Sequence, residues 1–340
     1  MKLVMLVLVA LGLTFAQEEP YHAPGFPPFA PEPQMLEVVE DRGDTVLVRH
    51  LMGETEVPKN PERVYTDASL FETAVSLGII PVASNRFDDA PMPPALASRV
   101  QETTLHPQGE TNLEAIVAAE PDLIIAYELN DVGWNKDTTV YEQLSAIAPT
   151  IVLQADASGF WGPATRALAE VFGLEERAEA VLSDYQATIQ TQCDRVRGVI
   201  GEESVTILRF VPGSLQVIGP GYELEGVGYI PFDTGRMYST CELTPGSELP
   251  QLLGTEGGAI ISLEILPDIQ ADHLIVYLLG EAETEATLAE YTEHPLWNSI
   301  PAVQQGNVYI FQDLADPVGY YTSTEALTRA ADIITGEASE

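Results

Sequence analysis

The chain has 340 residues, enough for about two domains of ordinary size, and 45% of them are hydrophobic, which argues against wholesale disorder. With 52 Asp and Glu against 15 Lys and Arg, the formal net charge is -37 at pH 7. This balance argues against a protein that binds nucleic acid or anionic lipid, because such proteins present a basic surface to the phosphates. We therefore expect no nucleic-acid partner, and we interpret the charge as a solvated acidic surface that would suit a saline habitat.

The first sixteen residues have the pattern of a signal peptide cut after Ala16. Lys2 precedes an apolar stretch over residues 3–13, which is shorter than a membrane-spanning helix requires. No Cys lies near the cut, so a lipid-modified N-terminal Cys is not expected. These features predict a periplasmic or secreted protein without membrane insertion.

The segment 17–59 follows, in two parts. Residues 17–34 are rich in Pro and Ala without a hydrophobic period, which predicts an extended tether. Residues 35–57 alternate apolar and polar side chains, which predicts a short hairpin.

Strands and helices alternate over 60–172, which predicts an N-terminal α/β lobe with a mostly parallel sheet. Thr111 is expected to cap a helix with Glu114 at its third position. The strands are expected at 63–65, 79–83, 122–127 and 150–153, and the helices at 69–77, 111–119 and 139–146.

A helical period continues over 175–197 without Gly or Pro, which predicts a long connecting helix within 173–202. The α/β pattern restarts over 203–340 and predicts a C-terminal lobe, with an irregular stretch from Gly219 to Gly258. Its strands are expected at 205–210, 215–218, 273–278 and 308–311, and its helices at 262–269, 283–291 and 322–335. The predicted architecture is two α/β lobes joined by one long helix.

The chain contains two cysteines, Cys193 and Cys241. In an oxidising compartment an even pair predicts a disulfide, with two separate buried thiols as the alternative. The five histidines are scattered in sequence, which argues against a zinc or manganese site.

Motifs of the main hydrolase and nucleotide-binding classes do not occur: there is no G-x-S-x-G, H-E-x-x-H or P-loop sequence. The sequence motifs therefore give no support for an enzyme of these classes. An exported hydrolase with a carboxylate pair, or an adhesion domain, stays open as an alternative.

Several segments in order resemble the substrate-binding proteins of ABC importers for siderophores, haem and cobalamin, from about residue 50 to the C-terminus. The matching segments are 53–64, 112–125, 141–149, 261–264 and 294–309. The resemblance implies a non-catalytic monomer with a ligand cleft between its lobes. The resemblance further implies that the protein captures a ferric siderophore and delivers it to an ABC permease with its ATPase. Iron would enter only as part of the chelate, without a resident cofactor; haem, with His106 or Tyr127 as an axial ligand, or cobalamin is the alternative.

A bulky, anionic ferric chelate calls for guanidinium donors and flat aromatic walls. Arg209 lies near the end of a predicted strand, where α/β folds present ligand groups and where related proteins often carry Arg. Arg86 follows a strand, and Arg236 lies in the irregular stretch. The aromatic candidates are Tyr127, Trp134, Tyr141 and Trp161 from the first lobe and Tyr238 and Tyr320 from the second.

In the family, one exposed carboxylate per lobe pairs with Arg on the permease, which here implies Glu114 and Glu264. Each stands in a Leu-Glu pair near the start of a predicted helix. Helix capping alone would account for each Glu. Two departures bear on the ligand: no Arg stands just before Asn112, and the stretch from Gly219 to Gly258 lacks the helix of the family.

Overall fold

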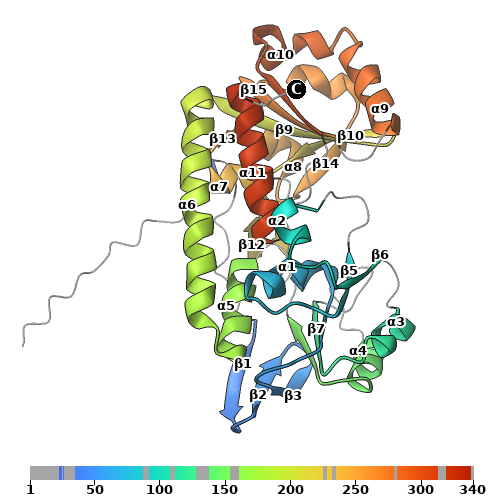
Figure 1. Ribbon diagram of the computed structural model, residues 1–340. Coiled ribbons are helices and arrows are strands. Elements are labelled where there is room, and N and C mark those ends of the chain that lie inside the picture. Colours follow the sequence, from blue (N-terminus) through green and yellow to red (C-terminus); the bar gives the residue numbers. More distant parts are fainter. Residues whose placement is uncertain are drawn as a thin grey trace, which may run out of the picture.

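Figure 1 shows the computed structural model, in which two α/β lobes lie one above the other along the long helix α6 (Glu175–Ile200). The structure describes residues 23–24, 26, 35–86, 92–107, 112–127, 138–153, 161–224, 228–231, 235–278, 282–312 and 319–337. The predicted signal peptide over 1–16 and the candidate Trp134 lie outside these residues.

The polypeptide first forms a three-stranded antiparallel sheet of β1 (Glu37–Asp41), β2 (Thr45–His50) and β3 (Gly53–Pro58). The expected hairpin is the β2–β3 pair, and β1 adds a strand to it. Val46, Val48 and Val57 point from this sheet into the core of the N-terminal lobe.

The N-terminal lobe contains a five-stranded, all-parallel sheet with the order β6-β5-β4-β7-β8. The apolar runs of β7 and of the edge strand β8 are buried, because parallel strands are covered on both faces. The elements are β4 (Val64–Thr66), α1 (Ala68–Ser76), β5 (Ala83–Arg86), α2 (Pro94–Ala97), β6 (Thr104–Pro107), α3 (Leu113–Ala118), β7 (Leu123–Tyr127), α4 (Thr138–Ser145), β8 (Thr150–Leu153) and α5 (Trp161–Phe172).

Two local expectations in this lobe are wrong. The strand expected at 79–83 is β5, which lies at Ala83–Arg86. The side chain of Asn112 caps α3 by accepting from the N–H of Ala115 at 3.0 Å, so the helix begins one residue later than a Thr111 cap requires. Glu114 is then the second residue of α3 and not its third, and the expected capping box does not apply.

The C-terminal lobe is built on a sheet with the order β14-β10-β9-β15-β16, with short β13 beside β9. β9, β15 and β16 run parallel, while β10 is antiparallel to both β9 and β14. Its strands are β9 (Ser204–Val211), β10 (Ser214–Ile218), β11 (Gly221–Leu224), β12 (Gly228–Pro231), β13 (Thr244–Pro245), β14 (Gly258–Ile261), β15 (His273–Leu278) and β16 (Val308–Gln312). Its helices are α7 (Arg236–Thr240), α8 (Leu249–Leu253), η1 (Leu263–Asp268), α9 (Ala282–Thr292), η2 (Trp297–Ser299), α10 (Pro301–Gln305) and α11 (Tyr320–Thr335).

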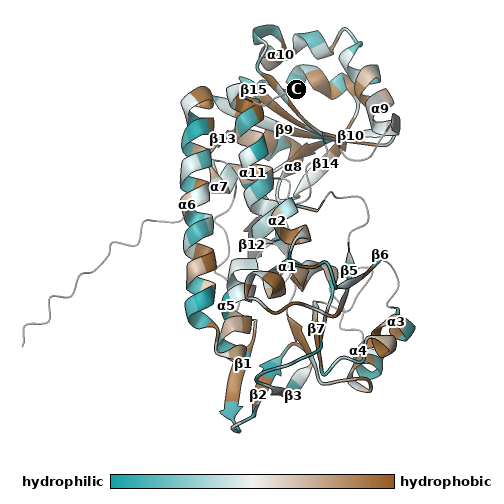
Figure 2. Ribbon diagram, viewed as in Figure 1, coloured by the Kyte–Doolittle hydropathy of each residue, from teal (hydrophilic) through white to brown (hydrophobic). Residues whose placement is uncertain are grey.

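The sheets of both lobes are hydrophobic, whereas α6 and α11 carry hydrophilic faces (Figure 2). The structure thus confirms two α/β lobes with mostly parallel sheets, and α6 lies within the interval 173–202 expected for the connecting helix. The helix expected at 262–269 is a 3-10 helix, because Pro267 has no N–H with which to continue an α-helix. Among the described residues, no helix combines the length and apolarity needed to cross a membrane.

Part of the predicted tether is packed against the C-terminal lobe. Ala23 and Phe26 are buried in the core cluster of that lobe, and the ring of Phe26 stacks on Tyr229 of β12 with 6.1 Å between centroids. The expectation of a free tether is therefore wrong at these two residues, because they bury apolar surface on a hairpin that the sequence pattern did not predict.

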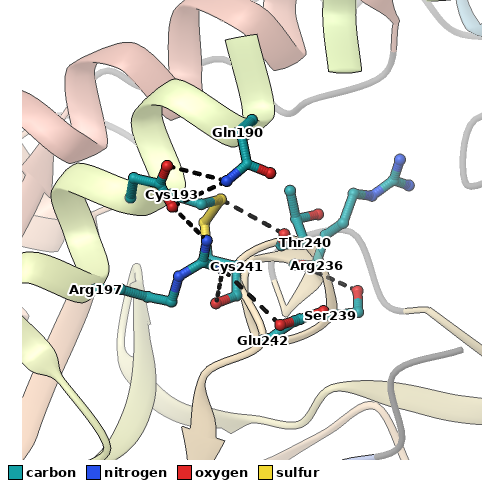
Figure 3. The surroundings of a disulfide bond; sticks show 9 residues. Gln190, Cys193, Arg197, Arg236, Ser239, Thr240, Cys241 and Glu242 are labelled. Carbon is teal, nitrogen blue, oxygen red and sulfur yellow. Dashed lines mark hydrogen bonds and ion pairs between the residues drawn. A yellow bond between two sulfur atoms is a disulfide. The ribbon is translucent and has the colours of Figure 1, made fainter. Parts of the chain in front are cut away.

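Cys193 of α6 and Cys241, which follows α7, form a disulfide, as expected (Figure 3). Arg197 of α6 donates to the carbonyl oxygen of Cys241 at 3.3 Å and pairs with Asp194 at 2.6 Å. The bond ties the connecting helix to the Gly- and Pro-rich part of the C-terminal lobe.

Candidate functional site

A row of four side chains crosses one face of the C-terminal sheet near the carboxyl end of β9. In the strand registers Ile260 faces Gln216, Gln216 faces Arg209, and Arg209 faces Tyr277. Residues paired in register share one face of a sheet. We call these four residues the cross-sheet row.

The cross-sheet row is accessible, although the sheet around it is buried. Ile260 is 71% exposed, and Gln216, Arg209 and Tyr277 are half-buried. On the opposite face, Phe210 and Val217 are fully buried. Four side chains of different chemistry are therefore presented at the end of a rigid sheet, where α/β folds place ligand groups.

Arg209 is held within this row. Its Nε–H donates to Oε1 of Gln216 at 2.8 Å, which fixes the plane of the guanidinium group. Tyr277 packs edge-on against Phe311, with 5.1 Å between ring centroids. A fixed guanidinium between an amide and a phenol ring can bind a carboxylate or catecholate oxygen while an aromatic arm packs beside it.

The carboxyl ends of the N-terminal strands bring together Asp67, Tyr127 and the backbone of Arg86. Asp67 caps α1 by accepting from the N–H of Leu70 at 3.1 Å and also accepts from the N–H of Tyr127, the last residue of β7. Burial raises the pKa of Asp67 to about 6, against the lowering effect of these backbone bonds. Arg86 ends β5, two strands away in the same sheet.

Two of the predicted ligand residues, Trp161 and Tyr320, lie between the lobes, next to α6. Trp161 of α5 packs edge-on against Tyr185 of α6, with 4.7 Å between centroids, and lies 6.4 Å from the ring of Tyr320. The hydroxyl of Tyr320 donates to Asp184 of α6. Burial raises the pKa of Tyr185, which the nearby charge of Arg236 opposes. Trp161 is only 3% exposed, so this group packs the junction of the lobes.

Two other candidates lie apart from the cross-sheet row. Tyr141 of α4 lies 3.2 Å from the hydroxyl of Thr55 and tilts against the ring of His50, beside the β2–β3 hairpin. Tyr238 of α7 is fully buried; its hydroxyl accepts from the N–H of Ile207 and donates to the carbonyl of Val205.

Among the residues that the structure describes, no three His, Cys, Asp or Glu side chains converge on a point where they could hold a metal ion. His106 is half-buried in β6, and Tyr127 is half-buried at the end of β7.

The two expected docking carboxylates are both exposed, one on each lobe. Glu114 lies in the first turn of α3, and Glu264 lies in the first turn of η1. The hydroxyl of Ser262 bonds to Glu264 and holds the pKa of its carboxyl below the usual range. The same Leu-Glu pair therefore stands at the start of a short helix in both lobes.

The sequence reasoning missed Gln216, Tyr277 and Asp67. One signal was available for Gln216, because Pro212-Gly213 is a turn dipeptide between two apolar runs and its pairing places residue 216 opposite Arg209. No local signal in the sequence predicts that Tyr277 lies beside Arg209, because the two residues are far apart in sequence.

Comparisons with known proteins agree with this architecture. Residues 80–314 match the family described as periplasmic binding protein. The chain is 27% identical over 282 residues to the Bacillus subtilis protein named "Probable siderophore-binding lipoprotein YfiY", covering 79% of this chain and 81% of that protein. It is 24% identical to the ferric enterobactin-binding periplasmic protein FepB of Escherichia coli, covering 65% and 66%.

The fold is also similar to solved structures. The crystal structure of Staphylococcus aureus SirA complexed with staphyloferrin B matches with a TM-score of 0.65 and 23% identity, covering 85% of this chain and 98% of SirA. At this level of identity the likeness concerns the fold.

Proposed function

Because the chain belongs to the periplasmic binding protein family, we propose that it captures a ferric siderophore between its lobes and delivers it to an ABC permease for iron uptake. The observation that carries the proposal is the cross-sheet row, which presents a fixed guanidinium group among an amide, a phenol and an exposed aliphatic side chain. The relatives named for siderophore and ferric enterobactin binding support the same class of ligand.

Arg209 is the charged contact in this proposal. Its guanidinium group would bind an oxyanion of the chelate, and Tyr277 and Ile260 would pack against its organic arms. From the facing lobe, Arg86 and Tyr127 contribute from the ends of β5 and β7. Trp134 stays a predicted contact.

The remaining candidates have supporting roles in the proposal. Trp161 and Tyr320 pack at the junction between the lobes, and Arg236 lies near enough to Tyr185 for its charge to act there. Tyr238 lies in the core, and Tyr141 lies against the hairpin. They position the walls of the site and do not touch the chelate.

The protein works outside the cytoplasm as a monomer that binds without catalysis or a resident cofactor. Cleavage after Ala16 would release it, and its two cysteines are joined to each other and cannot carry a lipid. A permease with its ATPase completes the system, and Glu114 and Glu264 are the contacts that orient the protein on it.

Native mass spectrometry of the mature protein tests the ligand class. The panel contains ferric citrate, a ferric catecholate, a ferric hydroxamate, haem and cobalamin. A one-to-one complex with an anionic ferric chelate, released intact on denaturation, is the expected result. Binding of haem or cobalamin alone, or cleavage of any ligand, would contradict the proposal.

A further inference from the structure

The C-terminal helix α11 is shared between the two lobes. Its first residues, Tyr320 and Tyr321, pack in a cluster with Phe71 of α1 and Leu96 of α2, both from the N-terminal lobe. Its later residues belong to the core of the C-terminal lobe: Leu327, Ala330, Ala331 and Ile334. One helix therefore enters two cores, as α6 does with Ala178 in one core and Cys193, Val196 and Ile200 in the other.

The N-terminus of α11 is held by a carboxylate from the other lobe. Oε2 of Glu72, in α1, accepts from the N–H groups of Tyr321 and Thr322 at 2.9 and 3.0 Å. Glu72 is 3% exposed. The first N–H groups of a helix have no partner within it, so this side chain satisfies two of them across the boundary between the lobes.

Gly319 provides the space for this contact. A Cβ atom added at Gly319 would lie 2.4 Å from Cβ of Glu72 and 2.8 Å from its Oε2. The backbone of Gly319 is extended, so the space beside Glu72 and not the backbone conformation requires glycine.

α11 and α6 run side by side in the same direction (Figure 1). Near the N-terminal lobe, Tyr320 donates to Asp184 of α6. Near the opposite end, Arg195 of α6 pairs with Asp332 and Glu337 at 2.6 Å each. The two helices are thus joined at both ends, about three turns apart.

We propose that Glu72 is a positioning residue that anchors α11 to the N-terminal lobe, so that α11 acts beside α6 as a second strut and sets the separation of the two sheets. The inference rests on the proposed function only in its consequence for ligand affinity. Two parallel struts resist twisting of one lobe against the other, which a single helix permits. The row on the C-terminal sheet and the strand ends of the N-terminal sheet are then held at a preformed distance, which lowers the ordering cost of binding.

Three variants and two controls test the anchor. Glu72→Ala removes both acceptor bonds, Glu72→Gln keeps an acceptor oxygen in the same place, and Gly319→Ala inserts a methyl group into the contact. The controls are Glu176→Ala, an exposed residue in the first turn of α6, and Gly198→Ala, where an added Cβ meets no atom within 4 Å.

The primary readouts need no ligand. Amide hydrogen exchange reports on Tyr321 and Thr322, and spin labels at Glu142→Cys and Glu293→Cys, exposed positions on opposite lobes, report the distance between the lobes. We expect Glu72→Ala and Gly319→Ala to reduce protection of these amides about tenfold and to broaden the distance distribution. Glu72→Gln and both controls should keep the narrow distribution.

Unchanged exchange and distances in Gly319→Ala would overturn the proposal, even if Glu72→Ala fails to fold. Loss of protection with an unchanged distance between the lobes would also overturn it, since Glu72 would then be a local cap. A titration with ferric citrate follows on the same variants. Hydrogen exchange and the distance between the lobes are measured on the free protein. Failure of this chelate to bind would therefore not affect the proposal for Glu72 and would count against the proposed function alone.

Discussion

Arg209 and Gln216 lie opposite each other on β9 and β10, and Nε of Arg209 is 2.8 Å from Oε1 of Gln216. The amide oxygen binds the Nε–H of the guanidinium group, and the pairing of the two strands sets the position of the side chain. The side chain that carries the charge is thereby held by the neutral amide of Gln216. A neutral amide does not cancel the positive charge of the guanidinium group, which can therefore attract an anionic ligand.

We expect Arg209→Ala to weaken binding of an anionic ferric chelate about 10- to 100-fold, because a hydrogen bond to a charged group is lost. Fluorescence titration with a ferric catecholate measures the effect. Arg49→Ala is the control, since Arg49 pairs with Glu54 at 2.8 Å on the β2–β3 hairpin, away from the cross-sheet row. Equal affinity in the two variants would remove Arg209 from the site.

Gln216→Ala should weaken binding of the same chelate less than Arg209→Ala, by about threefold to tenfold, because the charge remains and only its orientation is lost. Gln216→Glu should weaken binding more than Gln216→Ala, since a carboxylate beside Arg209 competes with the anionic ligand. If the Glu variant bound the anionic chelate better than the Ala variant, the ligand would meet this row through a different group.

Glu72→Gln should make stability less dependent on pH. Burial raises the pKa of Glu72 from 4.5 to about 7 in the folded protein, against the lowering effect of its bonds to α11. The folded state therefore binds this proton more tightly than the unfolded state does. Ionising Glu72 as the pH rises from about 5 to 8 lowers the free energy of unfolding by up to about 3 kcal/mol.

Urea unfolding at pH 5 and pH 8 measures this effect. The Gln variant should gain stability over the native protein at pH 8 and lose most of that gain at pH 5. Glu176→Gln, on the exposed first turn of α6, is the control. A constant difference between the native and Gln proteins at both pH values would show that Glu72 does not take up a proton in this range.

Loss of the Cys193–Cys241 bond should lower the free energy of unfolding by about 2–4 kcal/mol, because the bond closes a loop between residues 48 apart in sequence. Urea unfolding of the native protein with and without reductant measures the loss. The double variant Cys193→Ala with Cys241→Ala should be as labile as the reduced protein and insensitive to reductant. An unchanged free energy of unfolding of the native protein after full reduction of the disulfide would contradict the prediction.

Removing both docking carboxylates, with Glu114→Ala and Glu264→Ala, should leave chelate affinity unchanged and abolish iron uptake by cells that carry the partner permease. Charge pairs across an interface guide orientation and encounter, so added salt should reduce permease binding of the native protein. Glu120→Ala, an exposed neighbour beyond the end of α3, is the matched control. Normal uptake by the double variant would contradict the docking role and leave both residues only with their favourable interaction with the helix dipole.

The regular elements were predictable where the sequence repeats a pattern. The apolar run of β7 and the uninterrupted period of α6 indicate a strand and a helix without tertiary information. The stretch from 219 to 258 was not predictable, because its strands and helices have two to five residues each, too short to show a period.

The site was predictable only in part. Arg209 was placed correctly on a strand, because that strand is a local run of apolar residues. The contact of Glu72 with α11 could not be predicted from the sequence, because its partners lie 249 and 250 residues further along the chain. The grouping of Trp161 with Tyr185 and Tyr320 depends in the same way on how three helices pack.

The packing of Phe26 against Tyr229 determines which lobe lies next to a group attached upstream of Phe26. The first strand, β1, belongs to the N-terminal lobe together with Met35 and Leu36, yet Ala23 and Phe26 further upstream are buried in the core of the C-terminal lobe. An affinity tag or a fluorophore joined ahead of Ala23 therefore projects from the C-terminal half of the protein. A dye placed there would report on the C-terminal lobe, although its position in the sequence precedes the N-terminal lobe.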